Sequence, residues 1–552
     1  MVIMSNNSEF IFASRRSPVY GRGGMVATSQ PQAVAAGLEI LSQGGNAADA
    51  AVATAAALNV TEPTSTGLGG DCFALYYEAS SGRITALNGS GRAPMSLSIE
   101  RLKKEGLADN LPPFHPFTIT VPGACAGWCD LLDRHGRLPI SQVLTPAIRL
   151  ADQGFPVTPI TAYYWERSIP RLNRAPGGVA MTIDGRAPRA GEIFRNTGLA
   201  RTLRRVAEGG KAAFYQGEIA EAIARVVQQA GGCLSEDDLA AHTSTWEQPI
   251  NITYHGMRIW ECPPNGQGLA ALLALNLLEG FDLASMPALS TQRIHLMIEV
   301  MRLAFADTRW LVADPALNPA PLEGLLSKEY ADERRKLIHL DRATLNQLRG
   351  TPTSSSDTVY LTVVDAEGNA CSFINSNYMG FGTGIVPSGW GFTLQNRGLG
   401  FSLDRSHPNA LAPGKRPYHT IIPGMITVDS EGTHGIPNAL YASFGVMGGY
   451  MQPQGHMQVV SALVDDHLDP QAALDRPRFC IDEGTVGGRV ALEEGISHEV
   501  LIGLENLGHS VYSVNGQARA LFGRGQIIQR NAGTGVLCGG SDPRADGCAM
   551  TL

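Results

Sequence analysis

The chain has 552 residues, of which 44% are hydrophobic and 17% are charged, and its formal net charge is −8. This composition is typical of a folded globular protein and excludes a disordered, collagen-like or coiled-coil chain. Because the sequence contains no run of lysines or arginines, neither nucleic acid nor an anionic membrane surface is an expected partner. We therefore expect the partner to be a small molecule.

The N-terminal sequence MVIMSNN has neither a charged n-region nor an apolar h-region. The longest apolar stretch, residues 47–60, is interrupted by Asp49 and Asn59 and is too short to span a bilayer. We therefore expect a cytoplasmic protein without a membrane partner, in which residues 47–60 form a buried helix.

The nine cysteines form no Cys-x-x-Cys pair. Cys125 and Cys129 are four residues apart, but no histidines nearby would complete a zinc site. Free buried thiols are the simpler interpretation, and no metal or cofactor is expected.

Apolar residues at helical spacing predict further helices at 146–152, 216–229 and 291–311. Residues 350–356 are polar, without apolar periodicity, and are typical of a linker. Strands are predicted at 358–365 and 370–374 with a turn at Gly368-Asn369, and again at 440–446 and 523–529, with a helix at 455–464. This order predicts helices packed on sheets.

Thr358 occupies the first position of a predicted strand, directly after Asp357 and a serine-rich segment. An N-terminal nucleophile enzyme requires this arrangement: the hydroxyl attacks its own peptide bond, and hydrolysis then frees an α-amino group that serves as general base. By itself the signal is weak, because Asp and Thr before a strand usually indicate only a turn and a residue of high β-propensity.

Short segments with a characteristic order are spread along the chain. They are GGNAADA (44–50), GLGGD (67–71), VPG (121–123), PAI (146–148), FYQG (214–217), DT (357–358), FGTG (381–384), KRP (415–417) and MGG (447–449). In these segments and their order, the sequence resembles the γ-glutamyltransferase family over nearly its full length.

The resemblance implies an α+β fold, the four-layer αββα sandwich of N-terminal nucleophile hydrolases. It also implies a cut between Asp357 and Thr358. The products would be a large subunit of residues 1–357 and a small subunit of residues 358–552, which remain intertwined as a heterodimer within one structural domain.

By the same resemblance Thr358 is nucleophile and base, and Ser376 orients its hydroxyl or amine. Gly448 and Gly449 would form the oxyanion hole, where the missing Cβ lets a backbone N–H approach the reacting oxygen. The alternative is that this glycine pair only turns the chain. Thr362 is expected on the same strand face as Thr358, either positioning the nucleophile or simply packing.

Glutathione-cleaving members hold both the carboxylate and the ammonium of the substrate α-carbon, and this sequence differs at the aligned positions. It has Ser90 for an arginine, His419-Thr420 for a serine pair, Tyr378 for an asparagine, Arg397 for a glutamine-type residue and Gly400 for an aspartate. Arg92, two residues beyond Ser90, is an alternative carboxylate ligand.

The gain of Arg397 and the loss of the acid predict a pocket that accepts a carboxylate and rejects an ammonium, because arginine binds carboxylates bidentately. Two alternatives are open: Arg397 pairs with a protein acid such as Asp404, and His419 is a structural hydrogen-bonded histidine.

The predicted function is autoprocessing threonine amide hydrolysis of γ-glutamyl or related small dicarboxylic monoamides. Hydrolysis is expected to outweigh transfer, because residues 398–413 form a shorter lid than in glutathione-cleaving members. Glutaryl-amide acylase and oxamate amidohydrolase are the alternative activities. An inactive scaffold is the alternative from another class, and Asp357-Thr358 and Gly448-Gly449 argue against it.

Overall fold

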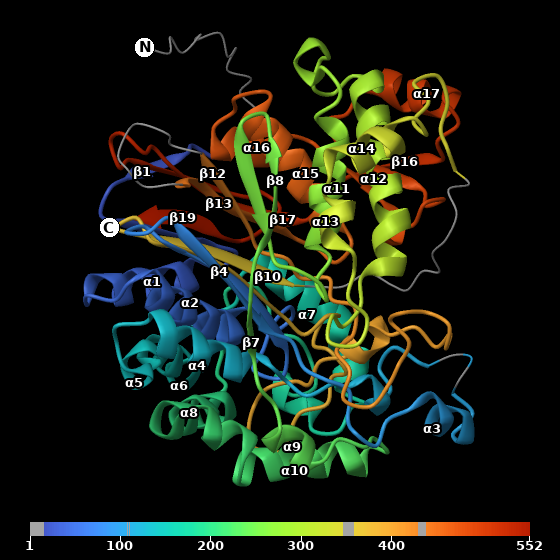
Figure 1. Cartoon of the computed structure of the whole chain (residues 1–552). Coiled ribbons are helices and arrows are strands. Elements are labelled where there is room, and N and C mark those ends of the chain that lie inside the picture. The colour runs from blue at the N-terminus through green and yellow to red at the C-terminus, as the bar shows by residue number, and fades with distance from the viewer. Residues whose placement is uncertain (1–15, 108, 110, 346–357, 429–437) are drawn as a thin grey trace.

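The computed structural model describes residues 16–107, 109, 111–345, 358–428 and 438–552. Two seven-stranded sheets, whose neighbouring strands are antiparallel, form the centre of the molecule (Figure 1). The first has the order β1 (Val19–Gly21), β18 (Leu537–Ser541), β17 (Arg524–Arg530), β13 (Ala439–Met447), β12 (Gly424–Val428), β9 (Met257–Glu261) and β8 (Ile250–Tyr254). The second has the order β19 (Cys548–Thr551), β2 (Gly24–Thr28), β10 (Val359–Asp365), β11 (Ala370–Ser376), β3 (Asp71–Glu78), β4 (Arg83–Gly89) and β7 (Thr245–Glu247).

Each sheet is covered by helices on its outer face, while β10 and β11 of one sheet contact β13 and β17 of the other (Figure 1). On the side of β10 lie α1 (Pro31–Ser42), α2 (Ala47–Thr61), α4 (Ala124–His135), α5 (Ile140–Val143), α6 (Thr145–Gln153), α8 (Thr197–Tyr215), α9 (Glu218–Gln229) and α10 (Glu236–Ala240). On the side of β13 lie α11 (Gly268–Leu278), α12 (Thr291–Leu311), α13 (Leu322–Leu325), α14 (Lys328–Arg335), α15 (Met451–Val464), α16 (Pro470–Asp475) and α17 (His498–Asn506). The predicted four-layer αββα sandwich is confirmed.

Smaller elements complete the fold. They are α3 (Ile99–Lys104), α7 (Pro159–Leu172), the sheet of β14 (Phe479–Ile481), β15 (Val490–Glu493) and β16 (Val511–Val514), the pair β5 (Phe155–Pro156) and β6 (Ile193–Phe194), and the 3₁₀ turns η1 (Pro116–Thr118), η2 (Gly178–Met181), η3 (Leu283–Ser285), η4 (Arg397–Gly400), η5 (Asp482–Gly484) and η6 (Gly516–Phe522).

The helix α2 is buried along its whole length, and its many alanines let it pack closely against β10 and β11. Asn46 caps its first turn by accepting hydrogen bonds from the backbone N–H groups of Ala48 and Asp49. On the opposite side α15 is equally buried and packs on β13. These two helices therefore hold the central strands from both sides.

The predicted helix at 291–311 has the observed bounds, and the one predicted at 216–229 begins later, at Glu218, because Gly217 has a positive φ of 68°. The linker predicted at 350–356 lies outside the described residues. No helix in the described ranges combines the length and apolarity needed to cross a bilayer. All nine cysteines are free; eight are buried, as expected, and Cys548 is half-buried.

Candidate active site

Thr358 lies immediately before β10 and is fully buried in the uncleaved chain. Because Val359 pairs with Asn375 of β11, Thr358 stands opposite the last residue of that strand, Ser376. The two hydroxyl oxygens are 3.2 Å apart. The predicted nucleophile and the residue predicted to orient it are thus brought into hydrogen-bond contact, while Asp357 lies outside the described residues.

The Ser376 hydroxyl is a junction of several hydrogen bonds. It accepts from the backbone N–H of Tyr378 at 2.9 Å and from Nη2 of Arg397 at 3.3 Å. The GLGGD motif approaches this strand end so closely that a Cβ on Gly70 would lie 2.2 Å from the Ser376 carbonyl oxygen. The glycine therefore permits the packing that fixes Ser376.

Arg397 lies in η4, is fully buried and connects two of the predicted site residues. Its Nη1 donates to Oγ1 of Thr420 at 2.7 Å, and its guanidinium stacks 4.2 Å from the ring centroid of Tyr378. Burial lowers the pKa of Arg397 to about 10. Within the described residues no carboxylate lies at salt-bridge distance from it, and Asp404 instead accepts hydrogen bonds from Ser406. The structure therefore contradicts the alternative in which Arg397 pairs with Asp404.

His419 is hydrogen-bonded through Nε2 to the carboxylate of Asp71 at 3.0 Å, and both side chains are fully buried. Burial, with a smaller contribution from Arg397, lowers the pKa of His419 to about 3, so that the ring is neutral. Asp71 also accepts from the backbone N–H groups of Gly91 and Gly123. This contact favours the alternative that His419 is a structural, hydrogen-bonded histidine. The hydrogen bond to Asp71 fixes the chain next to Thr420.

Gly448 and Gly449 connect β13 to the N-terminus of α15 and have positive φ values of 128° and 58°. Nε2 of Gln267 donates to the Gly449 carbonyl at 2.8 Å and to the Thr420 carbonyl at 2.6 Å. A continuous set of contacts therefore joins Thr358 to this turn. A helix N-terminus presents unpaired N–H groups and a positive dipole end, which favour an anion.

The sequence model of the family Gamma-glutamyltranspeptidase matches residues 33–552. The chain belongs to this family. It is 36% identical to the "Glutathione hydrolase-like YwrD proenzyme" of Bacillus subtilis, over 97% of this chain and 99% of the relative, and 33% identical to the "Acylase ACY 1 proenzyme" of a Pseudomonas species, over 98% and 96%. Its structure superposes on that of a cephalosporin acylase from Bacillus halodurans with a TM-score of 0.90 and 46% identity, covering 100% of this chain and 99% of the other. As a gamma-glutamyltranspeptidase family member, the protein is an amide hydrolase.

Two further arginines lie near the predicted site residues. Arg92, which the sequence nominated as a carboxylate ligand, is half-exposed and donates to the Thr243 carbonyl at 3.4 Å; its contact with substrate stays a prediction. Arg309, from the end of α12, was not predicted, yet its guanidinium lies 4.2 Å from the ring centroid of Tyr450, next to Gly449. Asp71 lies in the GLGGD motif but had no predicted role, whereas Gln267 and Arg309 gave no sequence signal.

Thr362 of β10 faces the first sheet, and its hydroxyl donates to Ser443 of β13 at 2.6 Å. Its contact favours the packing interpretation over a role in positioning the nucleophile. At Gly400 a Cβ would lie 2.6 Å from the Tyr418 carbonyl oxygen. An acidic side chain at this position would therefore require the backbone to move, which gives a physical reason for the missing acid.

Proposed function

We propose that this protein is an autoprocessing N-terminal threonine amide hydrolase whose acyl group carries a carboxylate but no ammonium, as in a small dicarboxylic monoamide. Processing would divide the chain into residues 1–357 and 358–552, with Thr358 as the new N-terminus. The relatives' designation as proenzymes supports this step.

In the processing step, Oγ1 of Thr358 attacks the carbonyl carbon of Asp357 and the peptide C–N bond breaks, which leaves an ester and a free α-amino group. Water then hydrolyses the ester and releases the carboxylate of Asp357. The hydrogen bond to Ser376 supports this role, because it restricts the rotation of the attacking hydroxyl.

In turnover, the freed α-amine takes the proton from Oγ1 as the oxygen attacks the substrate amide carbon. Backbone N–H groups at Gly448 and Gly449 would stabilise the tetrahedral oxyanion. The α-ammonium protonates the leaving amine, and water, activated by the same amine, hydrolyses the acyl ester. We propose hydrolysis rather than transfer as the main outcome.

The observation that carries the acyl specificity is the buried guanidinium of Arg397. A buried cation is costly unless it is paired, and within the described residues this guanidinium contacts only neutral groups, the hydroxyls of Ser376 and Thr420 and the ring of Tyr378. A substrate carboxylate would supply the missing charge. An ammonium would find no such partner, because Asp71 is already engaged by His419 and two backbone N–H groups.

The first prediction compares glutaryl anilide with γ-glutamyl anilide, which differ only in the amine. Because an unpaired ammonium must be desolvated, we expect kcat/KM to favour glutaryl by at least about tenfold, or about 1.4 kcal/mol. Arg397→Ala should lower glutaryl turnover strongly and turnover of the neutral butyryl anilide little, so that butyryl serves as the matched control.

A better kcat/KM for γ-glutamyl anilide, or unchanged glutaryl turnover in Arg397→Ala, would contradict the charge argument. The protein would then be inferred to hydrolyse γ-glutamyl amides, with residues other than those of glutathione-cleaving members contacting the substrate carboxylate and ammonium. If a folded, processed protein hydrolyses none of the three anilides, the proposed class of acyl group is wrong.

A further inference from the structure

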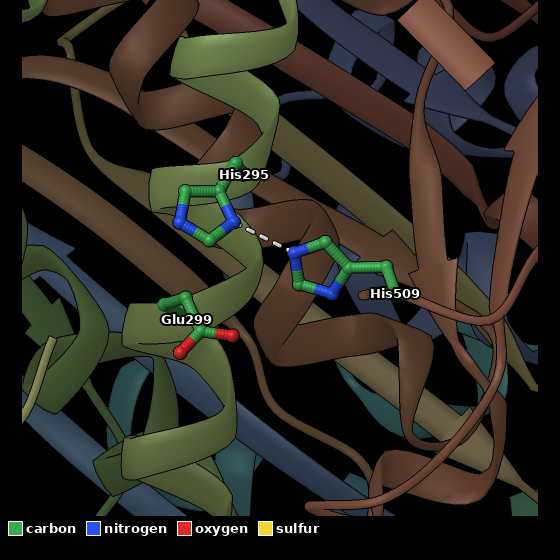
Figure 2. Close-up of side chains that lie close together, drawn as sticks. All are labelled: His295, Glu299 and His509. Atoms are coloured by element: carbon green, nitrogen blue, oxygen red, sulfur yellow. Dashed lines mark hydrogen bonds between the residues drawn. The ribbon is translucent and has the colours of Figure 1, made fainter. Parts of the chain in front are cut away.

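A second cluster of buried polar side chains lies outside the candidate active site. His295 and Glu299 are one turn apart on α12, and His509 lies between α17 and β16 and points toward them (Figure 2). The three side chains belong to residues that are 1–3% exposed. One nitrogen or oxygen from each lies within 4.8 Å of the others, a metal-ligand spacing that no other such group within the described residues has.

Hydrogen bonds join the two rings to each other and to the backbone. Nε2 of His295 donates to the His339 carbonyl at 2.8 Å, since a carbonyl can only accept. Nδ1 of His295 and Nε2 of His509 lie 2.7 Å apart and share one hydrogen bond. The carbonyl behind His295 is the partner that a metal-binding histidine usually has on its other ring nitrogen.

Two buried atoms of the cluster have no hydrogen-bond partner in the part of the chain that the structure describes: Nδ1 of His509 and Oε1 of Glu299. The other carboxylate oxygen of Glu299 accepts from the backbone N–H of Thr344 at 3.1 Å. Buried polar atoms are normally satisfied, so a carboxylate oxygen that accepts no hydrogen bond and lies beside two imidazoles indicates an additional ligand.

We propose that His295, Glu299 and His509 bind one divalent transition-metal ion of the zinc class. Two imidazole nitrogens and one carboxylate oxygen are donors that suit zinc, cobalt or nickel rather than magnesium or calcium, which prefer oxygen ligands. A water molecule would supply the fourth ligand. The site departs from the sequence-based expectation of no metal.

Binding requires a small rearrangement. Metal–nitrogen bonds of about 2.0–2.1 Å in tetrahedral geometry place two ligand nitrogens about 3.4 Å apart, so the two ring nitrogens must separate by about 0.7 Å. The proton that the two ring nitrogens share would move to Nδ1 of His509, which has no hydrogen-bond partner within the described residues. The metal replaces the hydrogen bond between the histidines.

Arg302 limits the affinity of this site. Its Nε lies 3.8 Å from Oε1 of Glu299, and its guanidinium also donates to the carbonyls of Val486 and Gly488. A positive charge at this distance disfavours a second cation, so we expect micromolar rather than nanomolar binding.

The site would join two parts of the chain that processing separates. His295 and Glu299 precede Thr358, and His509 follows it. The backbone of residues 339–344, which leads toward the cleavage segment, contacts both α12 residues and the end of α17. A bound metal would therefore fasten the large subunit to the small one.

The test uses the full-length protein without a polyhistidine tag, stripped of metal by a chelator and titrated with Zn²⁺ and separately with Co²⁺. We expect one equivalent bound per chain, a visible absorption band for Co²⁺ and a higher Tm with Zn²⁺. Glu299→Gln and His509→Gln, two substitutions at different elements, should each weaken binding at least about tenfold. His456→Gln is the matched control, because His456 forms a buried pair with Glu261 at 2.6 Å, and the described part of the chain adds no third ligand there.

Less than half an equivalent of either metal bound by the folded wild-type protein would overturn the proposal. So would equal affinity in the wild type, Glu299→Gln and His509→Gln, since the metal would then lie elsewhere. Because the readouts are metal content, absorption and Tm, the result does not depend on the proposed amide hydrolysis.

Discussion

At the residue scale, Ser376 at the end of β11 connects two functional groups of the candidate site. Its hydroxyl is within hydrogen-bond distance of the Thr358 hydroxyl and of the Arg397 guanidinium. One oxygen thus connects the proposed nucleophile with the proposed carboxylate ligand. Substitution at Ser376 should therefore affect both the rate of reaction and the preference for the acyl group.

The prediction is that Ser376→Ala lowers kcat by about 10–100-fold, the equivalent of losing one hydrogen bond to a charged or reacting group. Self-processing should slow as well, because the attacking hydroxyl loses its orientation. The readouts are single-turnover kinetics and the time course of cleavage on a denaturing gel.

Ser372→Ala is the matched control, because Ser372 is buried on the same face of β11 but bonds to Tyr360 and the Phe444 carbonyl. It should cleave and turn over at close to the wild-type rate. If both variants lose activity equally, Ser376 acts through strand packing and not through Thr358.

At the element scale, the turn between β13 and α15 places two glycines with positive φ at the start of a buried helix. Gly449→Val should lower kcat by about 10²–10³-fold, because a β-branched side chain is strained at this φ and obstructs a proposed oxyanion donor. Gly535→Val is the control, since Gly535 also has a positive φ of 70° but lies in open space. A folded Gly449→Val protein with normal kcat would exclude the donor role.

Much of the element order follows from the sequence because the central strands are apolar runs bounded by turns. β10 and β13 lie within a residue of their predicted bounds. The start of α15 was placed four residues late, because Pro453 in its first turn looks like a break, although proline is tolerated where the N–H has no helical partner.

Some residues of the site could likewise be predicted from the sequence, and others could not. Thr358, Ser376 and the glycine pair were predicted from family motifs, and Thr358 and Ser376 are in contact. The pairing of Asp71 with His419 joins residues 348 positions apart, and sequence spacing contains no information about such a contact. The cluster of His295 with His509 was missed for the same reason.

At the scale of the whole molecule, buried neutral histidines make stability depend on pH. Burial lowers the pKa of His242 to about 3, from an ordinary value of 6.5, while its ring stacks on Tyr215. Below about pH 6.5 the unfolded chain binds a proton that the folded chain refuses, so the free energy of unfolding falls as the pH falls toward 3.

We predict that His242→Phe makes this loss shallower by up to about 1.4 kcal/mol per pH unit between about pH 6 and pH 4. The measurement is urea unfolding across this range, with the exposed His498→Gln as control, which should keep the wild-type slope. An unchanged slope in His242→Phe would show that the ring is protonated in the folded protein.

The two large sheets also determine what processing can do. Each contains strands from both sides of residue 357: β2 pairs with β10 and β19, and β9 pairs with β12. The proposed large and small subunits would therefore each contribute strands to both sheets. Cleavage should leave a single species of unchanged size on a native column, which separates only in denaturant.

The most direct test of the account is the intact mass and N-terminal sequence of the purified wild-type protein beside Thr358→Ala and Thr358→Ser. The account predicts two wild-type fragments, the smaller beginning at Thr358, one uncut chain for Thr358→Ala, and slow cleavage for Thr358→Ser, whose primary hydroxyl can still attack. A wild-type chain that stays whole yet hydrolyses amides, or a small fragment that begins at another residue, would contradict it.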